Sequence, residues 1–305
     1  MSPGVESRGQ EVVISGIAPF NLKETLESGQ AFRWAGEDVF TGVVRGRVLR
    51  VRQDGDELVL MNPVDDEAVH MVIRYFALDM DHASIERRLV EKDAALECAV
   101  GFSSGLRLLR QDPWECLISF ILSARNAIPL IRRTVEQMAR TYGDPIATED
   151  GSGSEGLGAA CFFSFPTPGR LASASVLDLV KCGAGFRSQY VKATAERIAS
   201  GDFSLAGLKD LGYERAKAKL MELRGVGEKV ADCVLLFALG FYEAFPIDVW
   251  MTRVMRYIYF GGREVPASVI AEFAHRRFGD LAGYAQQYLF HYARKKLAAQ
   301  LRGLE

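Results

Sequence analysis

The hydrophobic pattern of the chain changes near Leu106. Before that point, short β-branched runs between residues 10 and 63 are separated by turn signals, and Asp54-Gly55 joins VLRVRQ to ELVLM. Alternating apolar residues and an Asp-Gly turn are typical of antiparallel hairpins, so we expect an antiparallel meander there. One helix is expected near Leu22–Ser28, and helices from about 64 to 100 are expected to cover the sheet.

Beyond Leu106 the apolar residues recur with the period of an α-helix, and strand signals nearly vanish. The Gly/Ser/acid-rich stretch 143–158 is predicted to be a loop. The pattern therefore predicts an α+β fold, with an antiparallel-sheet domain over 1–105 and an all-helical domain over 106–305. Helices are expected near 112–124, 127–142, 169–181, 188–200, 206–210, 213–223, 228–240, 248–259, 267–277 and 280–301.

Composition is that of an ordinary soluble globular protein, with 49% apolar and 25% charged residues. We find no apolar run near the roughly 20 residues that cross a bilayer, and the first ten residues lack a signal-peptide core. These observations predict a protein without membrane contact, in the cytoplasm or nucleoid, or in the nucleus if the source is eukaryotic. We also expect a monomer. The net charge of −2 does not exclude nucleic acid, because phosphate binding needs only a local basic patch.

The cysteines and histidines show no metal-ligand spacing. The five cysteines include no CxxC pair, which argues against a disulfide framework, a zinc ribbon and an iron–sulfur cluster. No cofactor is therefore expected to be required. The residues are Cys98, Cys116, Cys161, Cys182 and Cys233, with His70, His82, His275 and His291.

The segment 213–240 predicts two helices joined by the turn Leu223-Arg224-Gly225-Val226-Gly227. Gly225 and Gly227 permit positive φ, which would expose successive backbone amides at the start of the second helix. Such a helix start binds anions, and a DNA phosphate would bind there whatever its base. A plain tight turn between two bundle helices is the alternative interpretation.

Lys229 and Asp248 are the candidate catalytic residues. Lys229 falls in the first turn of the second helix, where the positive end of the helix dipole favours a neutral amine. A neutral lysine can attack a sugar carbon and carry the product as a Schiff base. Asp248 follows Pro246 at the expected N-cap of a helix, where it could stabilise positive charge on the sugar or move a proton. A simple capping role is the alternative, and both roles are compatible.

The run LRGVGEKVADC followed by FPIDVW resembles the helix-hairpin-helix DNA glycosylase superfamily. Lys229 is similar to the catalytic lysine of its bifunctional members. Relatives of endonuclease III carry a C-terminal four-cysteine cluster, whereas this chain has no cysteine after Cys233. A lysine without that cluster, behind a sheet domain, resembles the 8-oxoguanine DNA glycosylase branch. The resemblance covers roughly 10–300 and implies a TATA-binding-protein-like sheet domain before the catalytic domain.

The resemblance also implies a base-binding pocket. The Gly29 carbonyl would accept the N7–H that distinguishes 8-oxoguanine from guanine, whose N7 is an acceptor. Gln286 would contact the Watson–Crick edge, and Phe290 and Cys233 would stack on opposite faces of the base. Gln286 and Phe290 lie four residues apart, on one helical face, as a shared pocket wall requires. Pro246 is assigned to the same base-binding set.

Further residues are implied to contact double-stranded DNA containing an oxidised purine. They belong to the segment that fills the vacated duplex, to a motif facing the opposite base, and to the hairpin: Arg125, Asn126, Phe186, Arg187, Gly225, Gly227 and Val230. The backbone carbonyls of Met221, Leu223 and Val226 would hold a structural monovalent or divalent cation, with no redox or hydrolytic role.

Two other functions stay open at this level. One is a glycosylase of the same fold for an alkylated purine or oxidised pyrimidine, although Gly29 and Gln286 favour a purine with a hydrogen on N7. The other is a non-catalytic helix-hairpin-helix DNA-binding module. Leu130 stands where relatives carry an arginine that helps to read cytosine, and Trp250 where histidine is frequent. We therefore expect a broad tolerance for the base opposite the lesion.

Overall fold

A computed structural model describes residues 3–62, 64–147 and 162–301. Most of the expected loop 143–158 lies outside these residues. At its start, Pro145–Ile146 (β7) pairs with Phe162–Phe163 (β8) as a short antiparallel ladder, so the described part of the expected loop includes a strand. Within the described residues, no helix is both long and apolar enough to cross a bilayer.

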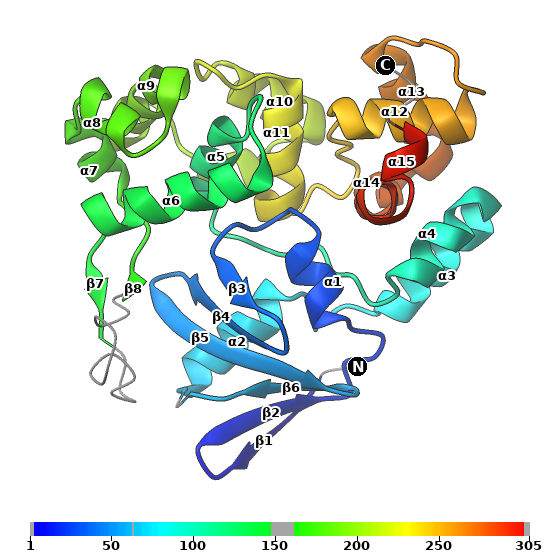
Figure 1. The fold of residues 1–305 in the computed structure, drawn as a ribbon, viewed down its shortest axis with the longest axis horizontal. Helices are drawn as coiled ribbons and strands as arrows, with labels where there is room; N and C mark the ends of the chain where they lie inside the picture. The colour runs from blue at the N-terminus through cyan, green and yellow to red at the C-terminus, as the bar shows by residue number, and fades with distance from the viewer. Residues whose placement is uncertain (1–2, 63, 148–161, 302–305) are drawn as a thin grey trace.

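The N-terminal part forms a six-stranded antiparallel sheet (Figure 1), as expected from its alternating pattern. Its spatial order is β1-β2-β6-β5-β4-β3, so the expected meander holds only for the last four strands. β2 pairs instead with β6 on one edge and with β1 on the other, so its backbone is hydrogen-bonded on both edges. The strands are β1 (Gly4–Arg8), β2 (Glu11–Ser15), β3 (Trp34–Gly36), β4 (Val39–Val44), β5 (Arg47–Asp54) and β6 (Glu57–Leu60).

The helices that follow the sheet pack against two separate hydrophobic cores. α2 (Asp66–Tyr75) packs on the sheet through residues such as Val72. The expectation that helices up to residue 100 cover the sheet is wrong for α3 (His82–Lys92) and α4 (Glu97–Phe102). Their apolar faces, with residues such as Leu89, join the core of the helical part. Figure 1 shows both helices beside α14, away from the sheet.

The remainder of the described chain is mostly helical. Ser175 caps a new helix by accepting from the Asp178 amide, which divides the expected helix 169–181 into two. The expected helix 228–240 continues as a π-helical turn over Leu235–Leu239, and 206–210 is a 3-10 turn. The helices are α5 (Pro113–Leu122), α6 (Ile128–Tyr142), α7 (Pro168–Ser173), α8 (Val176–Lys181), α9 (Ser188–Ala199), α10 (Tyr213–Met221), α11 (Glu228–Val234), α12 (Val249–Tyr259), α13 (Ala267–Phe278), α14 (Ala282–Lys296) and α15 (Ala298–Leu301).

A segment after α1 (Leu22–Glu27) fixes the sheet domain against the helical part. The buried Gln30 amide donates to the Arg107 carbonyl at 2.8 Å, and its oxygen accepts from the Leu109 amide at 2.8 Å. From the other side, Gln287 of α14 donates to the Ser28 carbonyl at 3.1 Å. Ser28 and Gln30, on either side of Gly29, are therefore both hydrogen-bonded, and these bonds fix the Gly29 backbone beside α14.

Candidate active site

The hairpin between α10 and α11 is closed by its own backbone. The Val226 amide donates to the Leu223 carbonyl at 3.0 Å. Gly225 adopts φ +86°, and a Cβ there would lie 2.4 Å from the Tyr190 ring, so only glycine fits. Positive φ is not used at Gly227, because that residue is the N-cap of α11 and takes extended backbone. The amides of the first α11 turn have no helical acceptor and face the hairpin mouth.

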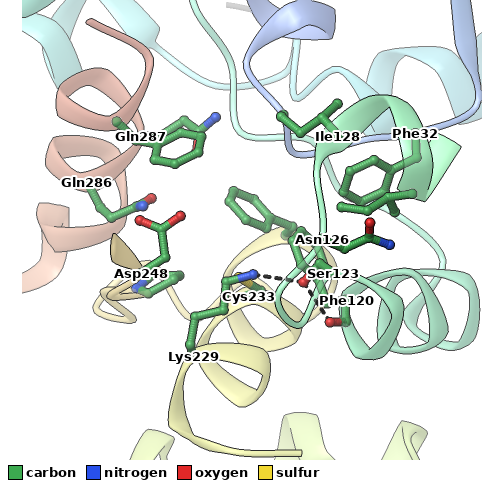
Figure 2. Close-up of a pocket in the computed structure, with 15 residues that line it drawn as sticks. Phe32, Phe120, Ser123, Asn126, Ile128, Lys229, Cys233, Asp248, Gln286 and Gln287 are labelled. Carbon is green, nitrogen blue, oxygen red and sulfur yellow. Dashed lines mark hydrogen bonds between the residues drawn. The ribbon is translucent and has the colours of Figure 1, made fainter. Parts of the chain in front are cut away.

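Lys229 lies in the first turn of α11, as predicted. Its Nζ donates to Ser123 Oγ at 2.9 Å, and that hydroxyl donates to the Phe120 carbonyl at 2.7 Å (Figure 2). The amine also lies 4.9 Å from the centre of the Phe120 ring. Because the Ser123 hydrogen is engaged with Phe120, the hydroxyl acts only as an acceptor toward the amine.

Asp248 is the N-cap of α12, as predicted from its position after Pro246. Its Oδ1 accepts from the Met251 amide at 2.8 Å, which fixes the carboxylate at the helix start. Oδ2 has no hydrogen bond to any described residue. Asp248 and Lys229 line one pocket, but within the described chain they form no ion pair, since the Lys229 hydrogen bond goes to Ser123. The second carboxylate oxygen is thus available to a bound group.

The pocket lies between the segment at Gly29 and helices α5, α11 and α14 (Figure 2). Gly29 has φ +85°, and a Cβ there would lie 3.0 Å from Ile128 and 3.4 Å from Phe290, so a side chain would crowd the wall. Gln286 is only 4% exposed, and its buried Oε1 has no hydrogen-bond partner. Burial raises the pKa of the Cys233 thiol to about 12, so this lining side chain is neutral. An orphaned acceptor deep in a cavity calls for a donor on the ligand.

Eight of the residues predicted from the sequence meet at this pocket: Gly29, Asn126, Lys229, Cys233, Pro246, Asp248, Gln286 and Phe290. Sequence reasoning missed seven others that line it: Phe32, Phe120, Ser123, Ile128, Ile131, Phe237 and Gln287. The apolar ones carry no signal that separates them from ordinary core. Ser123 is polar at the end of a buried helix, directly before Ala124-Arg125-Asn126, and that position could have been noticed.

The predicted DNA contacts outside the hairpin cluster around the turn between α5 and α6. Arg187 is only 7% exposed and donates to the Ala124 carbonyl at 2.7 Å and the Arg125 carbonyl at 3.0 Å. It therefore braces the turn in which Arg125 takes the strained φ of +50°. Asn126 donates to the Leu122 carbonyl at 3.1 Å. The Arg187 guanidinium carbon lies over the Phe186 ring, 4.4 Å from its centre, and Phe186 is still 56% exposed to solvent.

The predicted cation ligands lie in the hairpin. The Leu223 carbonyl already accepts from Val226 and keeps one lone pair, and Met221 and Val226 offer further carbonyls. Such oxygens suit a hard cation. Among the described residues, no cluster of three His, Cys, Asp or Glu side chains could hold a metal ion. The cysteines at 98, 116, 182 and 233 are free, and Cys161 lies outside the described residues.

Comparison with known proteins gives two family matches that together span residues 12–277. Residues 12–117 match the model of the 8-oxoguanine DNA glycosylase N-terminal domain. Residues 118–277 match the model of the HhH-GPD superfamily of base excision DNA repair proteins. Strands β2 to β6 of the sheet therefore fall in the first match, and the hairpin, Lys229 and Asp248 in the second.

Individual relatives agree over nearly the full length. A probable N-glycosylase/DNA lyase of Methanothermobacter thermautotrophicus is 34% identical, over 92% of this chain and 95% of the relative. A structure of MBOgg1 with a low-affinity DNA ligand is 40% identical, with a TM-score of 0.90, covering 97% of this chain and 99% of that one. The Clostridium acetobutylicum 8-oxoguanine glycosylase/lyase, bound to double-stranded DNA with cytosine opposite 8-oxoguanine, is 33% identical, with a TM-score of 0.90, covering 97% and 100%. The chain belongs to the 8-oxoguanine DNA glycosylase family of the HhH-GPD superfamily, as the resemblance predicted.

Proposed function

We propose that this chain is a bifunctional N-glycosylase/DNA lyase that removes 8-oxoguanine from duplex DNA. The observation that carries the proposal is the position of the Lys229 amine, held by Ser123 at a pocket that also presents Asp248 and the unpaired oxygen of Gln286. The names of the relatives point to the same activity. A base must leave the duplex stack to reach such a pocket, so the substrate is an extruded nucleotide.

Recognition of the lesion rests on complementary hydrogen bonds. The Gly29 carbonyl would accept the N7–H of 8-oxoguanine, whereas guanine would present an acceptor to an acceptor. The Gln286 oxygen, unpaired in the free protein, would accept from an N–H of the Watson–Crick edge. Phe290 and the neutral Cys233 thiol would pack on the two faces of the ring. A normal guanine would leave Gly29 facing a buried acceptor, at a cost of about 1–3 kcal/mol.

The chemistry would begin with attack of the Lys229 lone pair on C1′. The bond between C1′ and N9 breaks, the base leaves with the electron pair and takes up a proton, and the new amine loses a proton. The Asp248 carboxylate would stabilise the positive charge that develops on the sugar. Opening of the sugar ring then gives an iminium between Lys229 and C1′. Loss of a C2′ proton expels the 3′ phosphate and cleaves the strand.

Binding to the DNA backbone would not depend on the DNA sequence. The amides following Gly227, including Val230, would bind a backbone phosphate at the start of α11. A cation on the hairpin carbonyls would bridge to the same phosphate. Arg125 and Asn126 would enter the vacated duplex, with the exposed Phe186 beside the unpaired base and Arg187 supporting the turn.

Borohydride trapping tests the proposal. Borohydride reduces the iminium, so the wild-type protein should become covalently joined to DNA that contains 8-oxoguanine. Lys229→Gln should abolish the adduct and leave binding to an abasic-site analogue within about twofold. Lys219→Gln is the matched control, since Lys219 is exposed on α10 and paired with Glu222. Trapping that survives in Lys229→Gln would make another amine the nucleophile, and a wild-type protein that binds without trapping would be a non-catalytic DNA-binding module.

A further inference from the structure

A third residue extends the base-facing row of α14. Gln286 and Phe290 lie four residues apart, and Arg294 follows four residues later, on the same helical face. The Arg294 guanidinium carbon lies 5.2 Å from the centre of the Phe290 ring. Its Nη1 lies 3.0 Å from the position that a Gly29 Cβ would take. Arg294 thus adjoins two proposed base contacts without lining the pocket itself.

Arg294 shares this place with a second arginine, Arg132 of α6. Arg132 lies one turn after Ile128, whose Cδ1 is also 3.0 Å from that Gly29 position. Nη1 of Arg294 and Nε of Arg132 are both buried without a hydrogen-bond partner. Burial lowers the pKa of Arg294, the Asp248 charge opposes this, and the Arg132 charge adds to the lowering. The charges of Arg132 and Asp248 therefore both act on Arg294.

No acidic partner accounts for these arginines. Among the residues that the structure describes, no carboxylate forms an ion pair with either arginine, and Asp248 acts on Arg294 through its charge alone. Buried N–H groups without acceptors are costly, and two nearby positive charges repel each other, so an arriving anion would relieve both penalties. The guanidinium fork matches the geometry of a phosphate better than that of most other anions.

The orientation of the nucleotide in the pocket determines which DNA phosphate these two arginines would bind. Arg294 Nη1 lies 3.0 Å from the position that a Gly29 Cβ would take, so the arginine lies beside the segment that would read the N7 edge of the base. In an anti purine nucleotide, the N7 edge and the 5′ phosphate lie on the same side of the glycosidic bond. The phosphate nearest to the N7 edge is therefore the one on the 5′ side of the extruded nucleotide.

We propose that Arg132 and Arg294 form a subsite for the phosphate on the 5′ side of the extruded nucleotide. This inference rests on the proposed function, since it needs a nucleotide in the pocket. It is independent of the hairpin, which lies at the start of α11 and takes a different phosphate. Arg294 would also couple extrusion of the nucleotide to recognition of its base, because it would bind the phosphate and it packs against Phe290.

The test pairs an arginine substitution with neutralisation of one phosphate. Arg294→Met and Arg132→Met keep the aliphatic stem and remove the guanidinium, and Arg133→Met, at the exposed neighbouring position on α6, is the control. Duplexes carry 8-oxoguanine with either a normal phosphate or an uncharged methylphosphonate on its 5′ side. Kd is measured by fluorescence anisotropy over a series of salt concentrations, with Lys229→Gln in every protein to prevent turnover.

We expect the methylphosphonate to weaken binding by the parent protein about 10- to 100-fold, the range for a hydrogen bond to a charged group. Arg294→Met should lose a similar factor on normal DNA and almost nothing further on the methylphosphonate. The slope of log Kd against log salt concentration should fall by about 0.9 for that one contact. Arg133→Met should retain the parent affinity and the full methylphosphonate effect.

Two results would overturn the subsite. One is a methylphosphonate effect as large in Arg294→Met as in the parent, which would place the phosphate elsewhere. The other is an Arg294→Met protein with weaker binding but an unchanged salt slope, which would limit Arg294 to supporting Phe290. Failure of the proposed function is seen separately, as absence of borohydride trapping by the protein with Lys229 intact.

Discussion

Replacing Ser123 with alanine should slow the chemical step without weakening DNA binding. Ser123 Oγ is the acceptor for Lys229 Nζ, at 2.9 Å, and this hydrogen bond holds the amine at the pocket. Without it, the flexible lysine stem is free to leave the line of attack on C1′. The Ser123 side chain is small, so its loss removes little of the pocket wall.

The magnitude follows from that one bond. A partly buried hydrogen bond contributes about 0.5–1.5 kcal/mol net, and about 1.4 kcal/mol corresponds to a factor of ten in rate. Misalignment of the nucleophile adds to the loss, because reacting atoms must be held near 3–3.5 Å. We expect the single-turnover rate of Ser123→Ala to fall about tenfold, with Kd for an abasic-site analogue within about twofold of wild type.

The assay is single-turnover cleavage of an 8-oxoguanine duplex with enzyme in excess, with the borohydride adduct followed over the same time course. Ser119→Ala is the control, because Ser119 is a buried serine one turn earlier on α5 that does not line the pocket. A Ser123→Ala protein that cleaves at the wild-type rate would refute the positioning of Lys229 by Ser123. A loss confined to Kd would assign Ser123 to substrate binding instead.

Three further predictions concern the hairpin, the pocket wall and the opposing base. Gly225→Ala should lower stability and DNA affinity together, since φ +86° costs about 1–2 kcal/mol for alanine and the Cβ would lie 2.4 Å from Tyr190; a chemical denaturation midpoint equal to that of Gly227→Ala would contradict this. Iodoacetamide at pH 8 should label the exposed Cys98 well before Cys233, because burial raises the Cys233 pKa to about 12 and leaves almost no thiolate, whereas equal labelling in peptide mass spectrometry would show an accessible thiolate in the pocket. Cleavage of duplexes with each of the four opposing bases should vary little, since the exposed side chain at position 130 is the apolar Leu130, and a cytosine preference above about 10²-fold would contradict this expectation.

The catalytic pair could be predicted because its signals are local. Lys229 and Asp248 each stand at a helix start, marked by Gly225-Val226-Gly227 in one case and Pro246 in the other. The face shared by Gln286 and Phe290 follows from helical spacing alone. That these residues meet Gly29 came from the family resemblance, since no spacing rule connects positions so far apart in the chain.

The parts that escaped prediction depend on contacts between distant segments. Ser123 approaches Lys229 across 106 positions, and nothing near either residue announces it. The place of β2 beside β6 pairs Val12 with Leu60, and no local pattern in either segment identifies that partner. The pattern of α3 shows an apolar face but not whether a sheet or another helix covers it.

Peptide mapping of the borohydride adduct tests the central claim most directly. Wild-type protein is trapped on 8-oxoguanine DNA, digested with nuclease and protease, and the modified peptide is sequenced by mass spectrometry. The account predicts a sugar remnant on the Lys229 side chain, in the peptide that begins α11. A remnant on any other lysine or on the N-terminal amine would contradict it.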